Sequence, residues 1–87
     1  MLVYRTSGEA YELAEDILRE LTNITGLRSR GVIARPGLYV LRRTNMPAVL
    51  VEMGFISNPN DAELMVYSPN LFALGIYRGV LDYYGMR

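Results

Sequence analysis

The feature that most constrains the fold is an amphipathic pattern close to the amino terminus. Apolar residues recur at intervals of three and four residues, at Ala10, Leu13, Ala14, Ile17, Leu18, Leu21 and Ile24. This spacing lines up apolar side chains along one face of a helix. Thr6 and Glu9 have the spacing of a capping box, and Gly26 is a typical helix stop. The sequence therefore predicts a helix from about Ser7 to Thr25 that buries one face.

Three short apolar runs predict strands: MLVYR (1–5), LYVLR (38–42) and AVLVE (48–52). Only five residues separate the last two runs. A parallel crossover needs a dozen residues or more, so these two strands are antiparallel if adjacent and not adjacent if parallel. The long helix, in contrast, has the length for a right-handed crossover between parallel strands.

Two further helices are indicated near the carboxyl terminus. Asn58–Pro59 and Ser68–Pro69 each place a capping residue before a proline, which is a typical helix start. We expect a short helix over 59–67 and a longer one over 69–84, the second burying Leu71, Phe72, Leu74, Ile76, Val80 and Leu81. The element order predicts an α/β fold, with a partial sheet of about three strands packed with three helices in one domain over 1–87.

The composition narrows the function classes. The net charge is zero, so no basic excess points to nucleic acid. No window approaches the roughly 20 apolar residues of a membrane span, and the amino terminus lacks the pattern of a signal peptide. Hydrophobic residues make up 51% of 87 residues, which is a high share for a small core. Either the fold is compact or another chain covers part of its apolar surface.

Glu52 is the first candidate site residue. It shares a strand face with Ala48 and Leu50 and ends the strand. In open α/β sheets ligands bind at the carboxyl ends of strands, and apolar neighbours raise the pKa of a carboxyl group toward that of a general base. The alternative is that the strand simply ends and the acid meets water, which the spacing alone favours.

Charge is unevenly distributed along the sequence in one place only, where arginines cluster at Arg28, Arg30, Arg35, Arg42 and Arg43. They could meet substrate carboxylates or the acidic helix face, although a solvated surface is the commoner arrangement. The chain has no histidine and no cysteine. This excludes a Ser–His triad and leaves only carboxylates as metal ligands, a poor set for zinc.

The segment LYVLRRTNMPAVLVEMGFISNPNDAELM (38–65) closely resembles the C-terminal half of the zinc-dependent N-acetylmuramoyl-L-alanine amidases, the cell-wall hydrolases of many autolysins. The residues that fit the family's pattern are Leu41, Arg42, Pro47, Ala48, Glu52, Gly54, Phe55, Ile56, Ser57 and Asn58. The first strand and helix and the final helix also resemble the family, so the resemblance covers nearly the whole chain.

The resemblance implies that Glu52 is the catalytic glutamate, which reverses the preference drawn from spacing. In the family this glutamate acts on a zinc-bound water that attacks the amide between the lactyl group of muramic acid and L-alanine of the stem peptide. It also implies peptidoglycan as substrate and a location in the cell wall, the periplasm or outside the cell. Arg42 is the candidate for substrate binding.

The family's zinc ligands, two histidines and a glutamate, lie in the N-terminal half of its domain, and no residue of this chain matches one. We therefore expect an incomplete domain that supplies the base without the metal and is inactive alone. It is expected to self-associate, or to pair with a second chain or the missing half, through an unpaired strand edge. The alternative is a non-catalytic fragment that binds cell-wall peptide or another chain.

Overall fold

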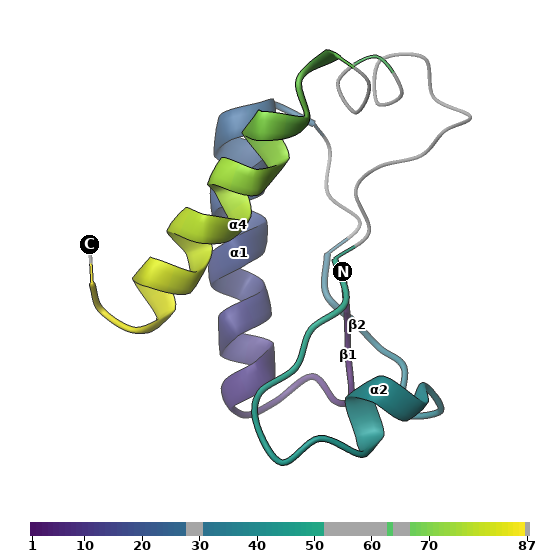
Figure 1. Cartoon of the computed structure of the whole chain (residues 1–87). Coiled ribbons are helices and arrows are strands. Elements are labelled where there is room, and N and C mark those ends of the chain that lie inside the picture. The colour runs from purple at the N-terminus through teal and green to yellow at the C-terminus, as the bar shows by residue number, and fades with distance from the viewer. Residues whose placement is uncertain (28–30, 52–62, 64–66, 87) are drawn as a thin grey trace.

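The computed structural model describes residues 1–27, 31–51, 63 and 67–86 (Figure 1). Two helices, α1 (Glu9–Thr25) and α4 (Pro69–Tyr83), lie against each other and form one layer. The strands β1 (Leu2–Val3) and β2 (Ile33–Ala34) lie beside them, and the short helix α2 (Tyr39–Arg42) lies near the carboxyl end of β1. This mixture of three helices and a small parallel sheet confirms the predicted α/β fold in part. The described residues form two strands, not about three.

Helix α1 confirms the helix predicted from the periodicity, with a different start. Gly8 occupies the N-cap position at φ 86°, and no side chain caps the helix. The predicted capping box is therefore wrong. It requires Thr6 at the N-cap and Glu9 at the third helical position, whereas Glu9 is the first residue of the helix. The end is as predicted: Gly26 has φ 70°, and its N–H donates to the Thr22 carbonyl oxygen.

The core forms where the inner face of α1 meets β1 and α4. Its buried residues are Met1, Val3, Ala14, Ile17, Leu21 and Phe72. Val3 and Ile17 are the largest fully buried side chains. The buried residues of α1 are spaced at three and four, as the sequence pattern predicted. Removing this apolar surface from water holds the helices to the strands.

Helix α4 crosses α1 at two glycines, Gly75 and Gly79, which are both buried. A Cβ added at Gly75 would lie 2.7 Å from the Leu21 Cδ2 atom. A Cβ added at Gly79 would lie 2.7 Å from the Ile17 backbone nitrogen, well inside van der Waals contact. The absence of side chains at these positions therefore sets how closely the two helices approach.

The final helix matches its predicted bounds, with Pro69 in its first turn. Its burial differs from the prediction. Of the six side chains expected to be buried, only Phe72 is buried, and Leu71, Ile76, Val80 and Leu81 are half-buried. Leu74 was predicted to be buried but is 37% exposed, because Gly75 and Gly79 define the contact line with α1 and Leu74 lies off that line. The predicted helix over 59–67 falls almost entirely outside the described residues.

The sheet is organised around β1. Strands β1 and β2 pair in parallel, with Leu2 opposite Ile33 and Val3 opposite Ala34. Helix α1 is thus the crossover between two parallel strands, as its length predicted. On the other side of β1, Leu2 and Leu50 form an isolated antiparallel bridge with N–H···O distances of 2.8 and 2.9 Å. Both edges of β1 are therefore occupied.

Two strand predictions need correction. The strand predicted over 38–42 is wrong, because Tyr39–Arg42 forms the helix α2. In this helix the backbone N–H of Arg42 donates to the Leu38 carbonyl oxygen. This segment satisfies its backbone hydrogen bonds within a helical turn and buries only Leu41. The run over 48–52 contributes only the bridge at Leu50 among its described residues.

No helix within the described residues is long and apolar enough to cross a membrane.

Candidate functional site

A cavity of about 320 Å³ opens at the carboxyl end of β1, where the chain enters α1. One wall comes from Tyr4, Arg5 and residues 7–10. The other comes from the end of α2 and the segment after it, and consists of Leu41, Arg42, Thr44, Met46 and Ala48. The cavity thus lies at the end of a parallel strand and beside a helix amino terminus, where α/β folds usually bind ligands.

The charged residues that line this cavity are Arg5, Glu9 and Arg42, all of them exposed. Arg19 forms ion pairs with Asp16 at 2.9 Å and with Asp82 at 3.3 Å. Within the part of the chain that the structure describes, neither Arg5 nor Arg42 forms an ion pair. Two arginines from segments far apart in the sequence are therefore brought to one cavity without a carboxylate partner from the described residues.

Polar groups complete the lining. Ser7 and Thr44 contribute hydroxyl groups, and Thr44 Oγ1 accepts a hydrogen bond from the Met46 backbone N–H at 3.3 Å. Glu9 also interacts electrostatically with Tyr83, the last residue of α4. Partial burial raises the pKa of Tyr83, and the negative charge of Glu9 raises that pKa further. The cavity is therefore mainly hydrogen-bonding and positively charged, with one carboxylate.

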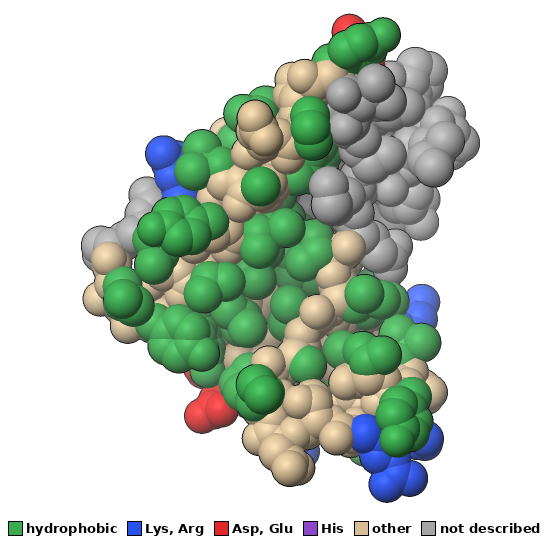
Figure 2. Space-filling model, in the orientation of Figure 1, with side chains coloured by type: hydrophobic (Ala, Val, Ile, Leu, Met, Phe, Trp, Pro, Cys, Tyr) green, Lys and Arg blue, Asp and Glu red, His purple; other side chains and the backbone are tan. Residues whose placement is uncertain are grey.

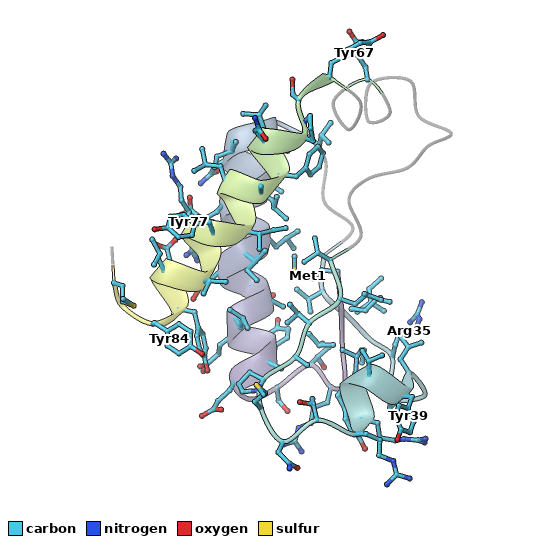
Figure 3. All side chains as sticks on the ribbon, viewed as in Figure 1. Met1, Arg35, Tyr39, Tyr67, Tyr77 and Tyr84 are labelled. Atoms are coloured by element: carbon cyan, nitrogen blue, oxygen red, sulfur yellow. The ribbon has the colours of Figure 1, made fainter. Side chains whose placement is uncertain are left out.

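Arg42 is the one predicted site residue that the structure describes. It ends α2 and lines the cavity, so the fold brings it to a place where it can contact a ligand. Its neighbour Arg43 does not line the cavity; its guanidinium lies 5.8 Å from the centre of the Tyr39 ring. Arg35 donates to the Ala34 carbonyl oxygen at 3.1 Å (Figure 3). Arg28 and Arg30 lie outside the described residues.

Glu52 lies outside the described residues, so its predicted place at a cleft stays a prediction. The segment before it has a clear direction. Because Leu50 is antiparallel to Leu2, the chain runs from Ala48 at the cavity toward Val51, which packs against the core cluster that contains Met1. Arg42 and Val51 therefore lie toward opposite ends of β1.

Arg5 and Thr44 were not singled out from the sequence as site residues. Arg5 carried a signal, since it is the last residue of a predicted strand and ligands bind at that end of parallel strands. Thr44 carried none, because its position depends on the turn after α2, a segment whose sequence predicted a strand.

The residues present do not fit a zinc site. Among the described residues, no group of three or more acids, histidines or cysteines lies close enough to hold a metal ion. The whole sequence has no histidine or cysteine. The carboxylates of α1 are spread along that helix and do not converge on one point.

The comparisons with known proteins agree on one family. The N-acetylmuramoyl-L-alanine amidase family matches residues 1–82. An uncharacterized cell wall amidase of Bacillus anthracis is 44% identical over 75 residues, 83% of this chain and 14% of its own length. The amidase LytC of Bacillus subtilis is 40% identical over 81 residues, 90% of this chain and 16% of its own.

The germination-specific amidase of Bacillus subtilis is 32% identical over 75 residues, which cover 83% of this chain and 30% of that protein. No solved structure matches the chain. The chain thus spans between 14% and 30% of the length of these three relatives. A match over nearly all of its residues shows that the chain belongs to the N-acetylmuramoyl-L-alanine amidase family.

Proposed function

We propose that this chain is part of a peptidoglycan hydrolase that cleaves the amide between the lactyl group of muramic acid and L-alanine of the stem peptide. The observation that carries the proposal is the segment from Pro47 to Asn58, with Glu52 at its centre, inside a family match over residues 1–82. One relative is named as a cell wall amidase and another as an N-acetylmuramoyl-L-alanine amidase, which supports a place in the cell wall or outside the cell.

Glu52 is the proposed general base. A water oxygen attacks the amide carbon, the C–N bond breaks, and the carboxylate carries the proton from the water to the leaving nitrogen. Arg42 is the proposed substrate-binding residue, because it lines the cavity at the carboxyl end of β1. The zinc expected from the family has no ligand set among the described residues, so those ligands have to come from outside them.

We expect the 87-residue chain alone to release no stem peptide from labelled cell walls, with or without added zinc. A catalytic zinc site uses about three protein ligands, and this sequence has neither histidine nor cysteine. The matched test is a chimeric amidase in which residues 1–82, the range of the family match, replace the corresponding segment of Bacillus subtilis LytC. Dye release by the chimera, and none by the chain alone, supports the proposal.

Two results would contradict it. Chelator-sensitive hydrolysis by the chain alone would mean that it carries its own metal ligands. A folded chimera with the zinc content of LytC but no turnover would favour the alternative, a non-catalytic member of the family that binds peptide or another chain.

The second candidate function is association with another chain, and exposed apolar side chains favour it. Figure 2 shows apolar side chains spread over α4 and toward α2. Tyr39, Val40, Met46, Tyr77 and Tyr84 are each more than 60% exposed. Figure 3 shows Tyr77 pointing outward from α4 and Tyr84 directly after the end of that helix. Apolar surface of this kind is typical of interfaces.

We therefore expect the chain to self-associate at micromolar concentration. Because both edges of β1 are occupied, the strand edges open to pairing within the described residues are those of β2 and of the segment around Leu50. Sedimentation velocity checks this. A sharp 9.8 kDa monomer across the concentration range would contradict this expectation. The variant Tyr77→Ser removes an exposed aromatic ring, so it should reduce association without loss of helix.

A further inference from the structure

The cavity at the carboxyl end of β1 has the features of a binding site for an anionic group. Arg5 and Arg42 both line it, and neither forms an ion pair with another described residue. Glu9 is the one acid among the lining residues, so this lining carries one net positive charge. Ser7 and Thr44 add hydroxyl groups that can donate hydrogen bonds.

The size and geometry favour a carboxylate on a short peptide. A volume of about 320 Å³ is at the lower end of the range of about 300–1,000 Å³ for small-molecule sites. The guanidinium group presents paired N–H donors that match the two oxygens of a carboxylate. The Glu9 carboxylate can accept from a backbone N–H of the same peptide, a role that it could not play for a bare anion.

We propose that this cavity binds a side-chain or terminal carboxylate of an acidic peptide and that Arg5 and Arg42 hold it. The identification of this peptide as the stem peptide of the cell wall rests on the proposed function.

The test is a titration of the isotopically labelled 87-residue chain, without metal, followed by the amide signals of Ser7, Gly8 and Thr44. The probe is acetyl-alanyl-glutamic acid amide, and its control is the glutamine peptide, which lacks only the carboxylate. The glutamine peptide cannot form the charge-assisted hydrogen bonds of the carboxylate, so it should bind at least about tenfold more weakly. This comparison needs no protein variant.

Matched variants assign the contact. Arg5→Gln and Arg42→Gln should each weaken binding of the glutamic acid peptide about tenfold. Arg43→Gln and Arg35→Gln remove the same charge from positions outside the cavity and should leave binding unchanged. Arg42→Lys keeps the charge but loses the paired donors, so it should restore only part of the affinity.

Three results would overturn the inference: equal binding of the two peptides, an equal loss in Arg43→Gln, or tighter binding of inorganic phosphate than of the peptide. The last would assign the cavity to phosphate. The measurement involves neither turnover nor zinc, so it separates this inference from the proposed function. An active chimera with no peptide binding here overturns the inference alone, whereas peptide binding with an inactive chimera supports the inference and counts against the amidase proposal.

Discussion

Replacing Glu52 by glutamine in the chimeric amidase is expected to lower the rate of stem-peptide release by about 10²- to 10⁴-fold, the usual contribution of a positioned general base. Glutamine keeps the size and hydrogen-bonding capacity of the side chain but cannot take up a proton. The zinc content and the thermal unfolding of the chimera should stay unchanged, because the proposed role of Glu52 is proton transfer. The measurement is dye release from labelled cell walls, with metal analysis of the same samples.

Glu63→Gln is the matched control, since Glu63 is an exposed glutamate 11 residues further along the chain. It should retain the full rate. If Glu52→Gln keeps more than about a tenth of the rate, general-base catalysis by this residue is contradicted. If Glu52→Gln loses both rate and metal, Glu52 belongs to the metal site instead.

The second large effect concerns the crossing of α1 and α4. Gly79→Ala is expected to lower the free energy of unfolding by about 1–3 kcal/mol, the usual cost of overpacking a core. The added Cβ would meet the Cα and N atoms of Ile17, which are backbone atoms and cannot rotate away. Because these backbone atoms cannot move aside, we expect a cost at the upper end of this range, so that a gain in helix propensity of about 1 kcal/mol from glycine to alanine still leaves a net loss of about 2 kcal/mol. Urea unfolding followed by circular dichroism measures it.

Two controls make the expectation specific. Gly75→Ala should cost less, because its closest contact is the Leu21 Cδ2 atom at the end of a flexible side chain. Gly37→Ala should be neutral or slightly stabilising, since a Cβ at Gly37 meets no atom within 4 Å. A Gly79→Ala chain as stable as the unchanged protein would mean that the helices do not pack along these glycines.

Part of the candidate site was accessible from the sequence. The motif around Glu52 and the position of Arg42 within it were recognisable, because a motif is a local string of residue types. The cavity was not, because its two walls come from residues 4–10 and 41–48. Arg5 and Arg42 line the same cavity only because α1 returns the chain to the sheet and the turn after α2 forms the second wall of the cavity.

The sequence by itself determined the elements whose hydrogen bonds are local. The periodicity of α1, its stop at Gly26 and the start of α4 at Pro69 all appear in the structure, because a helix bonds residues four apart and its signals lie within it.

Tertiary structure alone decided the remainder. Strand pairing joins distant residues, so Ile33 and Ala34 became β2 from a connector with no strand pattern. The run over 38–42 has the residue types of a strand but forms a helical turn, whose backbone N–H groups bond within the turn and not to a neighbouring strand. Gly79 lies at the helix crossing because the backbone of Ile17 passes there, a contact that no spacing along the chain specifies.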